Sequence, residues 1–113
     1  MEIRVLRYFL TIAREGSITS ASNFLHITQP TLSRQIKELE EELGQKLFQR
    51  GSHSMTLTRE GMYLRKRAEE IIAILDKTES EFHSIEDVVS GDIYIGGGET
   101  DAIKLIAEKL KEL

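Results

Sequence analysis

The sequence of 113 residues has no cysteine, no tryptophan and a single proline. Without cysteine, neither a disulfide framework nor a thiolate metal site can form, and a reducing compartment is expected. No apolar run approaches the roughly 20 residues of a membrane span, and the N-terminus lacks the apolar core and cleavage site of a signal peptide. We therefore expect a soluble, cytoplasmic chain that makes no membrane contact.

Residue patterns that mark catalysis, metal binding or nucleotide binding are also missing from the sequence. The histidines at positions 26, 53 and 83 have neither paired spacing nor cysteine partners. No nucleophile elbow is present. The run Gly96-Gly97-Gly98 is neither a Walker loop nor a dinucleotide fingerprint. The sequence therefore predicts a protein that is not an enzyme and that uses no metal or cofactor.

The net charge of -4 conceals an uneven distribution along the chain. Residues 1–68 hold 11 basic and 7 acidic side chains, a balance of +4, whereas residues 69–113 hold 4 and 12, a balance of -8. This asymmetry favours an interaction of the first half with a polyanion. Chance clustering on solvated faces explains the counts equally well, so charge alone does not decide.

A helix with one apolar face and a polar N-terminal half is predicted between Thr28 and Gly44. Thr28 can cap the helix, Pro30 suits its first turn, and Gly44 is the expected stop. The apolar face consists of Leu32, Ile36, Leu39 and Leu43. The first two turns offer amide, hydroxyl and basic side chains, which bind base edges and phosphates, and the second half is acidic. An anion-binding helix of this kind would enter a DNA groove by its N-terminal end.

Two shorter helices are predicted before this one. Apolar residues recur at helical spacing over residues 3–13, and Gly16 ends that helix. Ser17 or Thr19 can cap a second, short helix, and residues 26–27 form a tight connection into the next. This order is a helix-turn-helix whose three-helix core is completed by the leading helix.

A two-stranded hairpin, or wing, is predicted from residues 46–50 and 54–58, which are short runs of alternating apolar character. An isolated hairpin is marginal in water, so its apolar side chains must pack on the helices: Leu47, Phe48 and Leu57. Its tip would then bring Arg50 and His53 beside the recognition helix, within reach of the DNA backbone or minor groove.

The longest helical pattern begins at Thr58 and runs to about Val89, where Ser90-Gly91 breaks it. Spacings of four and three alternate along a heptad seam that consists of Leu64, Ala68, Ile71, Leu75, Thr78, Phe82, Ile85 and Val89. A single exposed helix would leave this seam in water, so we expect the same helix of a second copy to cover it, giving a homodimer. The alternative is that the seam packs on the chain's own core.

The last residues predict the opening of an α/β unit: a short strand at 92–96, a glycine loop, and a helix capped by Thr100. A lone strand cannot satisfy its own backbone groups, so the unit is truncated. The predicted fold is mainly α, a winged helix-turn-helix of three helices and a two-stranded wing. The predicted domains are a DNA-binding domain at residues 1–58, a linker and dimerisation helix at 59–90, and the α/β start at 91–113.

The segment FLTIAREGSITSASNFLHITQPTLSRQIKELEEELGQKLFQR, followed by LTREG and a long helix, resembles the N-terminal domain of LysR-type transcriptional regulators over about residues 3–90. The resemblance implies a major-groove surface made of Thr28, Gln29, Pro30, Thr31, Ser33, Arg34 and Lys37. Thr28 and Thr31 would also hold phosphates, and Arg50 and His53 would belong to the wing. The segment GDIYIGGGET would begin the effector-binding domain, with Thr100 lining its pocket.

Three positions depart from the family's usual pattern. His53 stands where the wing usually has arginine, and an uncharged histidine weakens contact with the minor groove at neutral pH. Glu60-Gly61 replaces the usual Ala-Gly, and Ser22 replaces a customary alanine of the second helix. None of the three is expected to break the fold.

Two functions are compatible with these patterns. The first is a sequence-specific double-stranded DNA-binding domain of a dimeric bacterial transcriptional regulator, with the recognition helix in the major groove of an inverted-repeat operator. The second is a protein-interaction module that dimerises through a coiled-coil helix without specific DNA readout. Higher oligomers and a small-molecule effector are expected only for the full-length protein.

Overall fold

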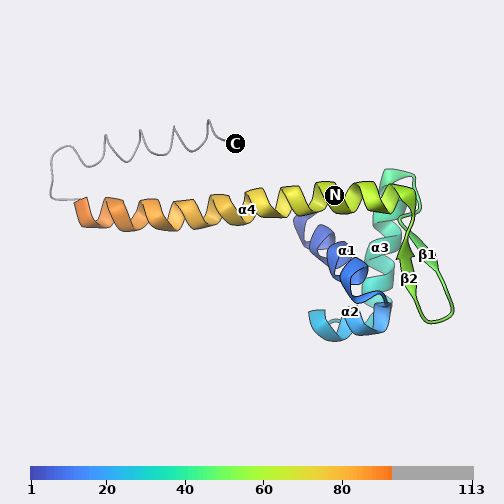
Figure 1. Ribbon diagram of the computed structural model, residues 1–113. Coiled ribbons are helices and arrows are strands. Elements are labelled where there is room, and N and C mark those ends of the chain that lie inside the picture. The colour runs from blue at the N-terminus through green and yellow to red at the C-terminus, as the bar shows by residue number, and fades with distance from the viewer. Residues whose placement is uncertain (93–113) are drawn as a thin grey trace. The chain divides into compact units, whose positions relative to one another are not determined.

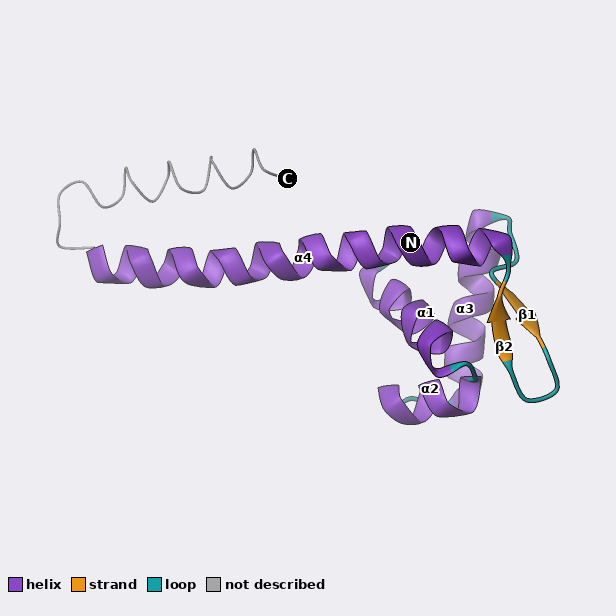
Figure 2. Cartoon of the chain, in the orientation of Figure 1, coloured by secondary structure: helices purple, strands orange, loops and turns teal. Residues whose placement is uncertain are grey.

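The computed structural model describes residues 1–92, with side chains up to residue 85 (Figures 1 and 2). Its elements, in chain order, are α1 (Ile3–Glu15), α2 (Ile18–Leu25), α3 (Gln29–Leu43), β1 (Phe48–Arg50), β2 (Met55–Leu57) and α4 (Arg59–Asp92). The chain divides into two units, residues 1–72 and 73–113, with the boundary inside α4. The first unit contains the three helices and two-stranded wing of the predicted winged helix-turn-helix, which confirms that fold class.

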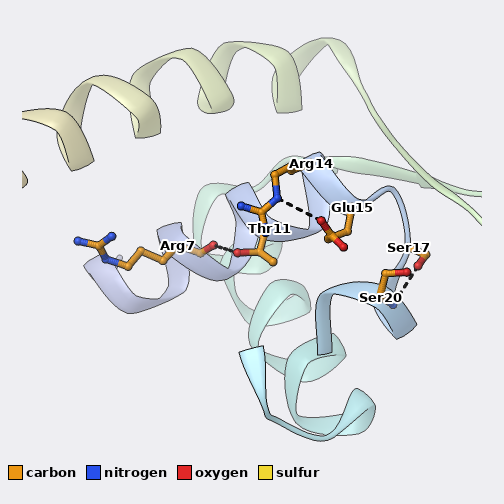
Figure 3. Close-up of polar contacts among 6 residues, drawn as sticks. All are labelled: Arg7, Thr11, Arg14, Glu15, Ser17 and Ser20. Carbon is orange, nitrogen blue, oxygen red and sulfur yellow. Dashed lines mark hydrogen bonds and ion pairs between the residues drawn. The ribbon is translucent and has the colours of Figure 1, made fainter. Parts of the chain in front are cut away.

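The turns on either side of α2 contain residues in the left-handed backbone conformation, and a serine caps the start of the helix. Gly16 ends α1 with φ 75°. The Ser17 hydroxyl oxygen accepts a hydrogen bond from the Ser20 amide at 3.1 Å, which starts α2 as Figure 3 shows. His26 ends α2 with φ 58°. Helix-turn-helix turns often use glycine at such a position, because glycine adopts a positive φ without steric cost. Histidine is one of the few other residues enriched there.

Helix α3 begins and ends where the sequence predicts. The Thr28 hydroxyl oxygen accepts from the Thr31 amide at 3.4 Å, and Gly44 ends the helix with φ 68°. Leu32, Ile36 and Leu39 are buried as expected. Leu43, the last residue of the predicted apolar face, is 38% exposed. The last turn of α3 extends past the core, and the buried face therefore ends at Leu39.

The core lies between the helices and the base of the wing. Its buried apolar members are Val5, Leu6, Phe9, Ile12, Ala21, Leu32, Ile36, Leu39, Leu47, Phe48, Met55 and Ala68. The Phe9 and Phe48 rings lie 5.3 Å apart between centroids, so α1 and β1 contact directly. A tilted ring pair of this kind adds roughly 0.5–1.5 kcal/mol to the apolar burial.

The wing packs on the helices through its base. Its strands are antiparallel, with Phe48 opposite Leu57 and Arg50 opposite Met55. The Met55 amide donates to the Gly16 carbonyl at 2.9 Å, which ties β2 to the turn between α1 and α2. Phe48 is buried and Leu57 is partly buried against the core. The expectation that the apolar side chains of the hairpin hold it against the helices is confirmed.

Helix α4 starts against the wing. The Thr58 hydroxyl accepts from the Gly61 amide at 3.0 Å and donates to the Lys46 carbonyl at 2.6 Å. Gly61 is buried, and a Cβ there would overlap the Leu47 carbonyl oxygen. The side of Gly61 that faces the wing therefore has no room for a side chain.

Helix α4 continues to Asp92, so the prediction of a break at Ser90-Gly91 was wrong. One glycine costs a helix about 1 kcal/mol, which does not by itself end a long helix. Asp92, the first residue of the predicted strand, is helical, and the rest of that strand and Thr100 lie outside the described residues. No helix within residues 1–92 has the length and apolarity that a membrane span requires.

The predicted seam of α4 has two kinds of position. In the first unit, Ala68 is fully buried in the core, and Leu64 and Ile71 pack against that core partly buried. The chain's own core therefore covers Ala68 fully and Leu64 and Ile71 in part. In the second unit, Leu75 and Thr78 are partly buried, Phe82 is exposed and Ile85 is buried. The side chain of Val89 lies outside the described ones.

Candidate nucleic-acid interface

The N-terminal half of α3 presents its polar side chains outward. Leu32 and Ile36 are fully buried, and side chains three or four residues apart share one face of a helix, so the residues between them point away from the core. The outward residues are those predicted to face the major groove of DNA: Gln29, Pro30, Arg34 and Lys37 are exposed, and Thr31 and Ser33 are partly buried.

Arg34 and Lys37 keep their charges available to an external anion. In the part of the chain whose side chains are described, neither makes a salt bridge. The pair Lys37–Glu41, which the helical spacing would allow, is not formed there. An exposed pair of this type is worth only about 0.2–0.5 kcal/mol, so an incoming phosphate would compete with it easily.

The two threonines at the start of α3 bond to each other. The Thr28 hydroxyl donates to the Thr31 hydroxyl oxygen at 2.8 Å, in addition to its capping bond. Thr28 is exposed and Thr31 is partly buried. The hydrogen bonds between these two side chains and the backbone thus stabilise the first turn of α3, which contains Gln29 and Pro30.

A shallow groove joins the start of α3 to the wing and to α2. Its lining consists of Ile18, Gln29, Pro30, Ser33 and Arg50. The Arg50 guanidinium donates to the Ser33 hydroxyl oxygen at 3.5 Å, a long bond that spans from β1 to α3. The structure therefore brings Arg50 beside the predicted reading surface, as the sequence leads one to expect.

A second groove lies between the wing tip and the start of α2. It is lined by Ser17, Ile18, Thr19, Arg50, Gly51, Ser52, His53, Ser54 and Met55. His53 is exposed there. The sequence analysis used Ser17 and Thr19 only as candidate helix caps and missed their place beside the wing. Nothing local signals that place, because the backbone bond from Met55 to Gly16 creates it.

Glu40 is the second residue that sequence reasoning missed. It belongs to the acidic run of the second half of α3, yet it is buried at 6% exposure. Its Oε2 accepts from the Leu47 amide at 2.7 Å and from the Phe48 amide at 3.4 Å. A usable signal existed, since Glu40 lies four residues after buried Ile36 and next to Leu39.

The remaining acidic residues of α3 lie in its C-terminal half. Glu38, Glu41 and Glu42 are exposed, and the Glu42 carboxylate pairs with the amino terminus at 2.6 Å. The positive charges near the two grooves and the negative charges of α3 are thus separated along the helix. Among the described residues, no group of acidic or histidine side chains is placed to hold a metal ion.

The family model described as bacterial regulatory helix-turn-helix protein, lysR family, matches residues 3–62 of this chain, which include both grooves and all of α3. The chain belongs to the LysR family. Among curated relatives, the HTH-type transcriptional regulator BsdA of Bacillus subtilis (strain 168) is 48% identical over 97 residues, covering 85% of this chain and 33% of the relative. The chain therefore spans about a third of the length of BsdA.

Other LysR-family similarities extend over most of the chain. The HTH-type transcriptional regulator BudR of Klebsiella aerogenes is 41% identical over 102 residues, covering 90% of this chain and 71% of BudR. A solved complex of the BenM DNA-binding domain with catB site 1 DNA is 43% identical with a TM-score of 0.74, covering 76% of this chain and 96% of that one. A CbnR DNA-binding domain complex with DNA is 31% identical with a TM-score of 0.71, covering 74% and 97%.

Proposed function

We propose that this LysR-family chain is the sequence-specific double-stranded DNA-binding part of a bacterial transcriptional regulator, with α3 lying in the major groove. The observation that carries the proposal is the orientation of α3, whose buried Leu32 and Ile36 turn Arg34 outward. The similarity to the BenM domain, which was solved with DNA, supports it.

Each outward residue has a distinct proposed role. Arg34 and Gln29 would read base edges, since a bidentate arginine contact to guanine gives about 1–3 kcal/mol of discrimination. Lys37 would hold a phosphate, as would the hydroxyls of Thr28 and Thr31. Arg50 and His53 would carry the wing's contacts. The bulk of the affinity would come from phosphates and would fall as salt rises.

Dimerisation through α4 is part of the proposal. Because Leu64, Ala68 and Ile71 already pack on the chain's own core, we propose that a partner contacts later positions of the seam: Leu75, Thr78, Phe82 and Val89. Ile85, which the sequence places in the same seam, is already buried within the chain. Phe82 is 46% exposed, which is consistent with a contact that a second copy would cover. Two copies related by two-fold symmetry would bind an inverted repeat, with half-sites spaced by the dimer.

The greater length of BsdA supports a proposal about the effector and the oligomeric state. BsdA is about three times as long as the matched segment, so we propose that a small-molecule effector and higher oligomers belong to the full-length protein. Thr100 would then line the effector pocket. A regulator of this kind would act in the cytoplasm, where bacterial DNA is found.

The test begins by selecting bound duplexes from a random pool, because the operator sequence is unknown. The chain is then titrated against the selected two-fold site, a single half-site and a scrambled duplex of equal length. We expect tight binding to the two-fold site, weaker binding to the half-site, and a steep salt dependence for all three. Equal affinity for the selected and scrambled duplexes would refute specific recognition.

Arg34→Ala separates DNA readout from protein interaction through α4. We expect it to lower affinity for the selected site about 10- to 100-fold, since bidentate contacts give about 1–3 kcal/mol, without changing dimerisation in sedimentation. Arg4→Ala is the matched control, because Arg4 is an exposed arginine on α1 that pairs with Glu2 at 3.3 Å. If Arg34→Ala left DNA binding intact, an interaction module without specific readout would be the better description.

A further inference from the structure

Two contacts hold β1 alongside α3. At one end, the Glu40 carboxylate accepts from the Leu47 and Phe48 amides, and at the other, Ser33 accepts from Arg50. Glu40 and Ser33 are seven residues apart, about 10.5 Å along a helix axis. Phe48 and Arg50 are two residues apart, about 7 Å along a strand. The chain therefore leads from the amides beside Glu40 to Arg50, whose guanidinium reaches Ser33 in the N-terminal half of α3.

Glu40 makes the stronger of the two contacts. It is buried, and its bond from the Leu47 amide is 2.7 Å long, a distance typical of charge-assisted hydrogen bonds, which are roughly twice as strong as neutral ones. The bond from the Phe48 amide is longer, at 3.4 Å. Ser33 and Arg50, in contrast, meet at 3.5 Å on an exposed surface. Of the two contacts, the one between Glu40 and the amides of Leu47 and Phe48 therefore contributes more to the position of Arg50.

We propose that Glu40 is a positioning residue for DNA binding, whose buried carboxylate sets β1 on α3 and so places the Arg50 guanidinium at the groove shared with Gln29 and Ser33. This inference rests on the proposed function. Glu40 itself would not contact DNA, because its side chain is buried against the backbone of Leu47 and Phe48. Its effect passes through the backbone of Leu47 and Phe48.

Other contacts keep the hairpin folded when Glu40 is changed. The Met55 amide bonds to the Gly16 carbonyl, and the Phe48 ring packs on Phe9. Glu40→Gln keeps the size of the side chain and an oxygen that can accept a hydrogen bond, but it removes the charge. We therefore expect a folded protein with a loosened β1.

A double-mutant cycle in DNA binding tests the positioning role. Glu40→Gln, Arg50→Ala and the double variant are titrated against the selected duplex over a range of salt. Each variant removes one phosphate contact from each protomer and therefore two from the symmetric dimer, which lowers the slope of log affinity against log salt by about 1.8. We expect each single variant to show this loss and about a fivefold lower affinity, with no further change in the double variant, because both remove the same contact.

Glu38→Gln is the control, because it removes the same charge from an exposed position on the same helix. It should leave the salt slope unchanged. Effects of Glu40→Gln and Arg50→Ala that multiply, or an unchanged slope in Glu40→Gln, would overturn the inference. If the unsubstituted chain binds no duplex selectively, the proposed function fails instead.

Hydrogen exchange in the unsubstituted protein provides a measurement that needs no variant. The Leu47 and Phe48 amides should exchange as slowly as the core amides of α3. Exchange as fast as that of the wing tip at Ser52 and His53 would contradict the anchoring role, even if Glu40→Gln proved unable to fold.

Discussion

The two halves of α3 perform different tasks within one helix of 15 residues. The N-terminal half carries exposed amide and basic side chains, whereas the C-terminal half carries the acidic residues and buries one of them, Glu40, under the wing. The first half is arranged for an external anion and the second for the fold itself. A carboxylate on a DNA-binding helix is therefore not necessarily a repulsive surface charge, because its burial decides its use.

The largest effect should come from the apolar contact in the C-terminal half. Leu39→Ala removes a side chain that is only 2% exposed and should lower the free energy of unfolding by about 2–5 kcal/mol. Leu43→Ala, on the next turn at 38% exposure, should cost much less. Urea denaturation of both variants measures the difference. Similar losses at the two positions would show that the core extends to the last turn of α3.

A change at Lys37, near the middle of α3, should act on DNA binding and not on stability. Lys37→Gln should weaken binding to the selected and scrambled duplexes by the same factor and lower the salt slope by about 1.8, because each protomer of the dimer loses one phosphate contact. Its unfolding free energy should stay within about 0.5 kcal/mol of the unsubstituted value, as for most surface changes. Fluorescence titrations at several salt concentrations provide the slope. A loss confined to the selected duplex would instead make Lys37 a base reader.

The smallest effect should come from an exposed acid in the last turn. Glu41 lies near the negative end of the α3 dipole, so Glu41→Gln should raise the unfolding free energy by about 0.3–1 kcal/mol. DNA affinity should change little, because Glu41 is far along the helix from the grooves. Thermal unfolding at low salt is the appropriate measurement, and a clear gain in DNA affinity would show that the two halves are not independent.

Much of this fold could be predicted from local chemistry. Thr28, Gly44 and Ser17 act at helix ends because a hydroxyl satisfies free amides and a glycine tolerates a positive φ. The spacing of Leu32 and Ile36 also identified which face of α3 turns outward. These signals operate within a few residues of one another, so the sequence displays them directly.

The remainder depends on contacts between distant segments. The partners of Glu40 lie seven and eight residues away, beyond the end of α3, and the approach of Ser17 to the wing depends on the Met55–Gly16 bond. The extension of α4 past Gly91 reflects a small local penalty that the rest of a long helix outweighs. The helical spacing of α3 indicates that Glu40 is buried, but no pattern within one segment identifies its partners or the bond from Met55 to Gly16.

The bare backbone at Gly61 has a consequence for the geometry of the reading surface. Since a methyl group there would meet the Leu47 carbonyl oxygen, the first turn of α4 can approach the hairpin only while that position stays empty. The missing side chain at Gly61 therefore allows the first turn of α4 to lie close to the base of the wing. A larger residue at position 61 would push the start of α4 away from the base of the wing.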